Sequence, residues 1–180
     1  MKKKINVIDL DKTLIPYDSF RLLIENELKS FNLYVGIITF LRLLKIINSN
    51  KHKEIISKYL YRKKDNVFFI HFADKIYNDI DTIVLTKVKN KTDVNTINVL
   101  ISNSPNIYVQ FIIDKLGWKG SGSYFDENMK FISLYSDEKI KWLKQNFNQI
   151  NYNYNFAISD SKSDLKLLSL FCDHILWNSQ

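Results

Sequence analysis

Short apolar runs alternate with longer stretches of helical periodicity along this chain of 180 residues. Four runs are mostly apolar and short, which predicts buried strands at 5–9, 97–102, 154–159 and 174–178. Between them, apolar residues recur three or four positions apart, as on one face of a helix. Strands that alternate with helices predict an α/β fold with a parallel sheet.

A long stretch with helical spacing separates the first two predicted strands. It runs from about residue 18 to residue 90 and contains few strand signals. We therefore predict a helical cap, residues 17–90, inserted after the first strand of a core that comprises residues 1–16 and 91–180. Only four glycines and two prolines occur in the chain, so long flexible linkers are not expected.

The second half of the chain predicts shorter elements. Residues 107–118 have the spacing of an amphipathic helix, and residues 122–135 contain a turn between two alternating segments, which predicts a hairpin. Residues 136–147 predict a helix with Ser136 as its N-cap. A further helix is expected over residues 161–171.

The most apolar segment, "FNLYVGIITFLRLLKIIN" at 31–48, is about long enough to span a bilayer. Arg42 and Lys45 interrupt its second half, where a spanning helix would carry no charge. We therefore predict a buried or partly exposed amphipathic helix. Docking of this segment on a membrane surface or on a partner remains open.

Composition and charge limit the classes of binding partner to be expected. A hydrophobic share of 46% with 25% charged residues is ordinary for a globular protein. The formal net charge of +7 permits nucleic-acid or membrane binding, but only three of the basic residues are arginines and the lysines are scattered. We interpret the excess as a solvated surface whose field favours anionic substrates, and expect no nucleic-acid partner.

The single cysteine, Cys172, excludes an internal disulfide and fits a reducing compartment. Its apolar neighbours predict a place in the core. The N-terminal "MKKK" is not followed by the apolar segment of a signal peptide, because an acidic residue comes within six positions. We therefore expect a cytoplasmic protein.

Polar residues gather where the predicted strands end. They are Asp9, Asp11 and Thr13 after the first strand, Ser102 and Asn103 after the second, and Asp160 and Asp164 after the third. Ligands of open parallel sheets bind at the carboxyl ends of the strands, so these side chains are expected to converge. Converging carboxylates repel one another unless a cation and a lysine offset their charge. The pattern predicts a phosphate site assisted by a hard ion such as Mg²⁺.

Phosphoryl transfer uses these residue types in defined roles. A carboxylate can attack phosphorus and form an aspartyl-phosphate. A second carboxylate two residues further along an extended chain points to the same side, where it can protonate the leaving oxygen and later deprotonate water. A hydroxyl and backbone N–H groups can hold the phosphoryl oxygens, and a lysine can neutralise charge in the transition state.

Four segments, "DLDKTL", "VLISNSP", "SDEKIKWL" and "ISDSKSDL", occur in this order over nearly the whole chain. They resemble the four motifs of the haloacid dehalogenase superfamily, and in particular its phosphoserine-phosphatase-like branch, in which a helical cap follows the first strand. The resemblance implies a Rossmann-like core and a Mg²⁺-dependent phosphatase that acts on a small phosphomonoester.

The resemblance also implies roles for individual residues. Asp9 would be the nucleophile and Asp11 the general acid and base. Mg²⁺ would be held by Asp9, Asp160 and the main-chain carbonyl of Asp11. Lys139 would be the lysine of the third motif, although Lys141 is an alternative on spacing alone.

Further positions complete the implied site. Thr13 would support the phosphate-binding loop, Ser102 would bind phosphate with help from the backbone of Asn103, and Asp164 would orient the site. Asp18 stands at the distance from the nucleophile where phosphoserine phosphatases carry an acidic residue that meets the substrate ammonium. The substrate is therefore expected to be an amino-alcohol phosphate such as phosphoethanolamine, a phosphoserine-like compound or a sugar phosphate.

Phosphoserine would also require a cation from the cap for its carboxylate, and Arg42 and Arg62 are the arginines available there. One departure from the branch is Ser159, which stands where glycine is common. The tripeptide "DKT" also resembles the phosphorylation motif of P-type ATPases, in which Asp11 would be the nucleophile. The preceding strand, however, delivers Asp9 to its end, and the chain lacks the membrane helices of such pumps.

Two alternatives to a phosphatase stay open. A phosphomutase would use the same residues and return the phosphate to its substrate. A non-catalytic basic protein would bind a membrane or nucleic acid and would not depend on Asp9.

Overall fold

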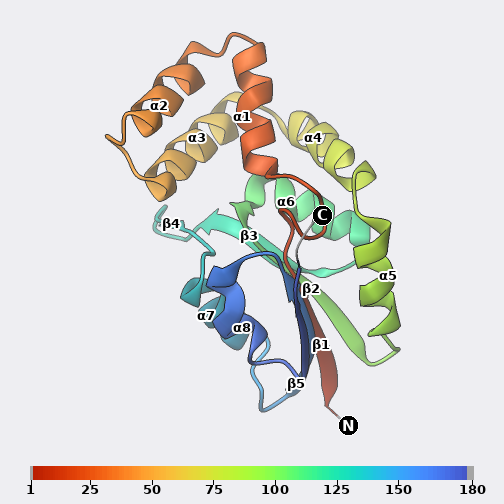
Figure 1. Cartoon of the computed structure of the whole chain (residues 1–180). Coiled ribbons are helices and arrows are strands. Elements are labelled where there is room, and N and C mark those ends of the chain that lie inside the picture. The colour runs from red at the N-terminus through yellow and green to blue at the C-terminus, as the bar shows by residue number, and fades with distance from the viewer. Residues whose placement is uncertain (1, 178–180) are drawn as a thin grey trace.

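Residues 2–177 are described by the structure, a computed structural model (Figure 1). Six strands form one sheet: β1 (Lys3–Ile8), β2 (Thr96–Pro105), β3 (Lys119–Phe125), β4 (Phe131–Ile132), β5 (Tyr152–Ser159) and β6 (Asp173–Leu176). Their order is β4-β3-β2-β1-β5-β6. All neighbours are parallel except β3 and β4, which form the predicted hairpin. The predicted α/β fold is confirmed. The predicted last strand reached residue 178, which lies outside the described residues.

Five helices connect β1 to β2: α1 (Ser19–Lys29), α2 (Leu33–Leu43), α3 (Ser49–Lys63), α4 (Asn66–Asn78) and α5 (Thr82–Asn90). The remaining helices are α6 (Asn106–Leu116), α7 (Asp137–Asn146) and α8 (Leu165–Leu168), the last preceded by a 3₁₀ turn (Lys162–Asp164). The helix expected over 161–171 is therefore shorter than predicted.

The sheet is covered on both faces, because successive residues of a strand point to opposite sides. Val7 belongs to the hydrophobic cluster that includes Leu143 of α7 and Leu167 of α8. Its neighbour Ile8 belongs to the cluster on the other face, with Ile112 of α6. The result is a three-layer arrangement in which β1 lies near the centre of the sheet.

The five helices between β1 and β2 do not all lie in the same place relative to the sheet. In Figure 1, α1, α2 and α3 lie beyond the carboxyl ends of the strands, whereas α5 runs alongside the sheet. Phe72 of α4 packs edge-on against Tyr108 of α6, with ring centroids 5.0 Å apart. Val84 and Val88 of α5 are buried in the same cluster as Ile8. The last helix of the predicted cap thus packs with the core.

Gly122 allows β3 to approach the end of β2 closely. A Cβ at this position would lie 2.4 Å from the carbonyl oxygen of Ser104 and 2.9 Å from the amide nitrogen of Asn106. Both are backbone atoms, which cannot move away without disturbing the strand end. A side chain at residue 122 is therefore incompatible with this arrangement.

One local prediction was wrong, and a second, Ser136 as the N-cap residue of α7, is confirmed only in position. Cys172 is exposed, because it follows α8 at the edge of the sheet and does not enter the core. Ser136 precedes α7, but its φ of 50° and ψ of −117° differ from the extended conformation of an N-cap residue, and its hydroxyl makes no capping hydrogen bond.

Candidate active site

The carboxyl ends of β1, β2 and β5 meet at a cavity of about 260 Å³ that is also bounded by α1, α3 and α7. Seven of the nine predicted site residues line it: Asp9, Asp11, Asp18, Asn103, Lys139, Asp160 and Asp164. The other two, Thr13 and Ser102, are buried and do not line the cavity. Residues far apart in sequence therefore converge as the parallel sheet predicts.

Lys139 of α7 joins two carboxylates. Its Nζ atom lies 3.0 Å from Asp9 Oδ1 and 2.6 Å from Asp164 Oδ2, and all three residues are buried. Lys141, the alternative on spacing, is exposed and pairs with Glu138. The helix therefore directs Lys139 to the end of β1 and turns Lys141 toward solvent.

The pKa values of this cluster reflect burial and mutual charge. Burial is the largest influence on Asp9 and raises its pKa to about 6, despite the opposing attraction of Lys139. For Lys139, burial disfavours the charged form, but the carboxylates of Asp9 and Asp164 outweigh it and raise the pKa above the ordinary lysine value. The lysine is therefore a permanent cation beside Asp9.

Asp11 is held by hydrogen bonds on both carboxylate oxygens. The backbone N–H of Ser19, the first residue of α1, donates to Oδ1 at 2.7 Å. The hydroxyl of Ser104 donates to Oδ2 at 2.6 Å, and that of Ser102 lies 3.4 Å from the same oxygen. Ser19 Oγ in turn contacts Ser104 Oγ at 3.0 Å and the Tyr108 hydroxyl at 2.9 Å.

This buried network gives Asp11 a defined orientation and a shifted pKa. Burial raises the pKa of Asp11, and the hydrogen bonds from Ser104 and Ser19 partly offset that effect. A carboxyl group of this kind holds a proton at higher pH than an exposed aspartate, as a general acid requires.

Asp160 follows β5 and lines the cavity. Its backbone N–H donates to Thr13 Oγ1 at 2.8 Å, so Thr13 ties the loop after β1 to the end of β5. Burial and the nearby charge of Asp9 raise the pKa of Asp160. Two partly desolvated carboxylates, Asp9 and Asp160, therefore lie close together at the cavity.

Ser159 links the two carboxylates that Lys139 joins. Its hydroxyl oxygen lies 2.8 Å from Asp164 Oδ2 and 3.2 Å from Asp9 Oδ2. A hydroxyl carries one proton, so it can donate fully to one of these oxygens at a time. Ser159, which stands where glycine is common in the phosphoserine-phosphatase-like branch, is thus part of the buried cluster.

Lys53 of α3 was missed by the sequence analysis. Its Nζ donates to the carbonyl oxygen of Asn103 at 2.6 Å and lies 5.6 Å from the centroid of the Phe20 ring. Burial lowers the pKa of Lys53 to about 8, although Asp11 and Asp18 attract its charge. One signal was available: Lys53 has helical spacing with the buried Ile56 and would stand on an apolar face.

Asp18 lines the cavity and also caps α1, because its Oδ1 accepts a hydrogen bond from the backbone N–H of Arg21 at 2.8 Å. The two arginines considered as cap cations do not line this cavity. Lys53, and neither Arg42 nor Arg62, is therefore the cap cation at the site.

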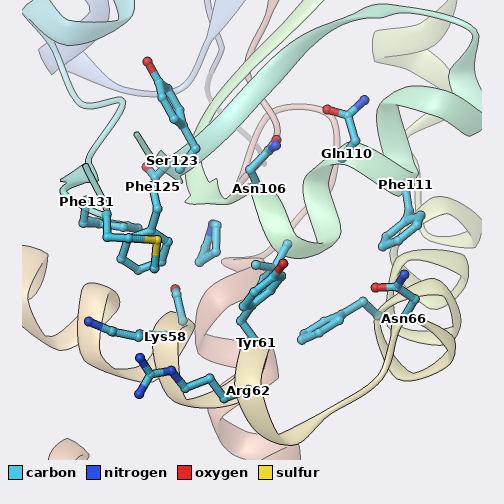
Figure 2. A pocket seen from close by; sticks show the side chains of 16 residues that line it. Lys58, Tyr61, Arg62, Asn66, Asn106, Gln110, Phe111, Ser123, Phe125 and Phe131 are labelled. Atoms are coloured by element: carbon cyan, nitrogen blue, oxygen red, sulfur yellow. The ribbon is translucent and has the colours of Figure 1, made fainter. Parts of the chain in front are cut away.

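A second cavity, of about 500 Å³, lies between α3 and the region formed by α6 and the β3–β4 hairpin (Figure 2). Figure 2 shows Tyr61 and Arg62 of α3 on one side and Asn106 and Phe131 on the other. Its lining contains no aspartate, glutamate or histidine. Although it is larger, it lacks the groups that phosphoryl transfer needs, and the smaller cavity is the candidate active site.

The oxygen donors at the small cavity suit a hard cation whose coordination shell is completed by water and substrate. Within residues 2–177, no three acidic, histidine or cysteine side chains are grouped to hold one ion. Asp9 and Asp160 supply two carboxylates, and the nearby charge of Asp9 contributes to the raised pKa of Asp160. Mg²⁺ is commonly bound by one or two carboxylates with waters and substrate phosphate, so the donor set fits this ion.

Fold and site together define an α/β enzyme whose carboxylates and buried lysine meet at the carboxyl edge of a parallel sheet. The chain belongs to the family of haloacid dehalogenase-like hydrolases, because the model of that family matches residues 7–169. The resemblance noted in the four sequence motifs is confirmed, and so is the prediction of a hydrolase. No curated protein sequence matches the chain significantly.

Solved structures share the fold. A protein of unknown function from Bordetella pertussis Tohama I is 12% identical, with 97% of this chain and 89% of that chain covered and a TM-score of 0.73. A haloacid dehalogenase family hydrolase from Salmonella enterica serovar Typhi is 12% identical, with 93% and 60% covered and a TM-score of 0.53. A phosphoserine phosphatase with a phospho-aspartyl intermediate analogue is 18% identical, with 98% and 95% covered and a TM-score of 0.49. At these identities the first two likenesses concern the fold.

Proposed function

We propose that this hydrolase is a Mg²⁺-dependent phosphatase that cleaves a small phosphomonoester through an aspartyl-phosphate on Asp9. The observation that carries the proposal is the contact of Asp9 with Lys139 at the cavity. A carboxylate at the end of a central strand, with a fixed cation 3.0 Å away, is placed to attack phosphorus while the lysine offsets transition-state charge.

Asp11 is proposed as the general acid and base. In the first step its proton passes to the leaving alcohol oxygen as the P–O bond breaks. In the second step it takes a proton from the water that attacks the aspartyl-phosphate, and inorganic phosphate leaves. The raised pKa of Asp11 supports this order, because the protonated form is needed first.

Phosphate contacts are proposed for the loop that follows β1 and for the carboxyl end of β2. The cavity is lined by Asn103, whose backbone would help to hold the phosphoryl oxygens. Ser102 is oriented toward Asp11 from a fully buried position, so a rotation of its hydroxyl is required for direct contact with phosphate. Thr13 supports the loop through the backbone of Asp160.

Mg²⁺ would be held by the carboxylates of Asp9 and Asp160 and by the main-chain carbonyl of Asp11, and Asp164 would orient Lys139. When bound, the ion supplies charge neutralisation at the phosphoryl oxygens. The raised pKa values of Asp9 and Asp160 support a cation here, because burial disfavours both negative charges and a cation would offset them.

The substrate is proposed to be small because the cavity is limited to about 260 Å³ and is covered by the cap. Asp18 offers a carboxylate for an ammonium group, and Lys53 offers a cation for a second anionic group. Amino-alcohol phosphates and sugar phosphates need only part of this set. A phosphoserine-like substrate, which carries both an ammonium and a carboxylate, would use both residues.

The test is hydrolysis of p-nitrophenyl phosphate by the whole chain with Mg²⁺ and after chelation. Asp9→Asn is expected to lower kcat by at least about a thousandfold, and Asp160→Asn is expected to raise the Mg²⁺ concentration needed for half-maximal activity. Asp114→Asn, an exposed substitution of the same kind on α6, is the control and should leave turnover unchanged. Wild-type turnover by Asp9→Asn would overturn the proposal.

A screen with phosphoethanolamine, phosphoserine and sugar phosphates side by side then identifies the substrate class. Release of free phosphate supports a phosphatase, whereas an isomerised phosphate ester without phosphate release would identify a phosphomutase. Salt-dependent binding of nucleic acid that is unchanged in Asp9→Asn would support a non-catalytic basic protein.

A further inference from the structure

Seven exposed apolar side chains lie in and next to α2 and together form what we call the α2 patch. It consists of Phe31, Leu33, Ile37, Phe40, Leu43, Leu44 and Ile46. Between 53% and 90% of each of these residues is exposed. In Figure 1, α2 lies at the outer edge of the cap, away from the sheet. Isolated exposed apolar residues are common, but a concentrated patch indicates an interaction surface.

Helical geometry places three residues of the patch on one side of α2. At 100° per residue, Leu33, Ile37 and Phe40 fall within about 60° of one another, and Leu44 continues the same row. The buried residues Val35 and Ile38 occupy the opposite side. The helix is therefore apolar on both sides, whereas a helix at the surface of a protein in water normally has a polar outer side.

The charges around the patch are of one sign. The segment from residue 28 to residue 53 contains no aspartate or glutamate, although the whole chain has 19 acidic residues. Lys29 precedes the patch in sequence, and Arg42 and Lys45 lie among its residues. Among the described residues, none of these three cations has an acidic partner within 4.0 Å.

We propose that the α2 patch docks on the surface of a membrane that contains anionic lipids. An amphipathic element that buries apolar side chains at the interface and places cations beside anionic headgroups has this composition. The helix cannot cross the bilayer: its 11 residues extend about 16 Å, against about 30 Å of hydrocarbon. Within the described residues, no helix meets the length and hydropathy of a membrane span.

The same charges argue against a second copy of this chain as the occupant. In a two-fold symmetric contact, each patch would meet its own copy, and the cations at Lys29 and Lys45 would be brought together without carboxylates of the segment to offset them. An anionic lipid surface supplies the opposite charge. A dimer or an acidic protein partner is therefore an outcome that the experiment has to separate from membrane binding.

Docking at this patch would also hold the active-site cavity near the membrane. The patch ends at Ile46, and Ser49, three residues later, lines the cavity. Asn50 accepts a hydrogen bond from Ser133 at 3.2 Å, which fixes the start of α3 against the core. This inference is independent of the proposed function, since binding is measured without substrate and does not require turnover.

The test is flotation of the full chain with vesicles of phosphatidylcholine alone and with 30% phosphatidylglycerol added. Binding is expected to the anionic vesicles, to fall at high salt, and to fall by about tenfold or more in the double variant Ile37→Glu with Phe40→Glu. Ile83→Glu with Val67→Glu is the matched control. These residues are 61% and 56% exposed, against 59% and 58% in the patch.

All variants are checked for thermal unfolding and for p-nitrophenyl phosphate turnover, which should not change because the patch does not line the cavity. Lys29→Gln with Lys45→Gln keeps the apolar surface and should weaken binding only to the anionic vesicles. Equal binding of the patch variant and its control would overturn the proposal. So would wild-type protein that ignores vesicles and forms a dimer that Ile37→Glu dissociates in sedimentation.

Discussion

The ammonium group of Lys53 lies 2.6 Å from the main-chain oxygen of Asn103 and thereby joins the cap helix α3 to the end of β2. The same oxygen accepts a hydrogen bond from Ser123 at 2.8 Å, so both a residue of α3 and a residue of β3 fix the end of β2. Lys53 thus has two properties that matter for the site: it positions the end of β2, and it brings a cation to the cavity.

Lys53→Met is expected to raise the KM for an anionic phosphomonoester by about tenfold, because a charge-assisted contact is lost, while kcat changes less. The measurement is a steady-state titration at pH 7 with phosphate as a competitive inhibitor for comparison. Lys58→Met on the same helix is the control, since Lys58 lines the other cavity. Equal effects of the two substitutions would contradict a role for Lys53 at the site.

The pH dependence of KM should reveal the same residue. Burial lowers the pKa of Lys53 to about 8, so its charge is lost as the pH rises through that value and KM should increase above about pH 8. In Lys53→Met this increase should be absent. A KM that rises identically in the variant would show that another group titrates.

Loss of the Lys53 charge, which should weaken substrate binding, should increase the stability of the fold. Its pKa is about 8 in the folded state and 10.5 ordinarily, so between these values the unfolded chain binds more protons. The stability of the fold therefore increases as the pH rises from 8 to 10.5, and below pH 8 the buried charge is a cost. Lys53→Met should stabilise the protein at pH 7 by about 1–2 kcal/mol, measured by urea unfolding.

Removal of the Lys139 cation between Asp9 and Asp164 should strongly destabilise the protein. Lys139→Met leaves two buried carboxylates without their partner, and we expect a loss of about 3 kcal/mol in the free energy of unfolding. Mg²⁺ should restore part of this loss, because a cation at Asp9 offsets the same charge. Lys141→Met should leave stability and turnover unchanged, and a comparable loss in that variant would reverse the assignment of the lysine.

Ser159→Ala tests whether the buried hydroxyl takes part in the chemistry. Its removal deletes the hydrogen bond to Asp164 and should cost about 1–2 kcal/mol of stability. Because Lys139 still holds both carboxylates, p-nitrophenyl phosphate turnover should fall by less than about tenfold. A loss as large as that in Asp9→Asn would assign the hydroxyl a direct role.

The sequence predicted those parts of the site that follow from strand periodicity. Asp9, Ser102 and Asp160 each stand next to an apolar run, and parallel strands place such positions at one edge. A lysine of α7 was also predicted, with Lys139 named and Lys141 as the alternative. The two lie on different sides of the helix, and Lys139 is on the buried side with Leu143.

The rest depends on tertiary contacts that local patterns do not contain. Lys53 reaches the cavity because α3 packs against the end of β2, and the sequence does not show how these two elements are placed. The hydrogen bonds of Ser19 and Ser104 to Asp11 require the start of α1 to meet the end of β2. The packing of α5 along the sheet likewise depends on its partners, because its helical spacing alone does not distinguish a cap helix from a core helix.

The hydrogen bond between the Ser19 N–H and Asp11 has a consequence for cap motion. Ser19 begins α1, so a displacement of that helix acts on the pKa of Asp11 in two ways: loss of the donor favours the protonated carboxyl, and access of water to the buried group favours the carboxylate. Because such coupling is reciprocal, the protonation state of Asp11 must in return change how easily α1 moves. Movement of α1 and proton binding at Asp11 are thus thermodynamically linked.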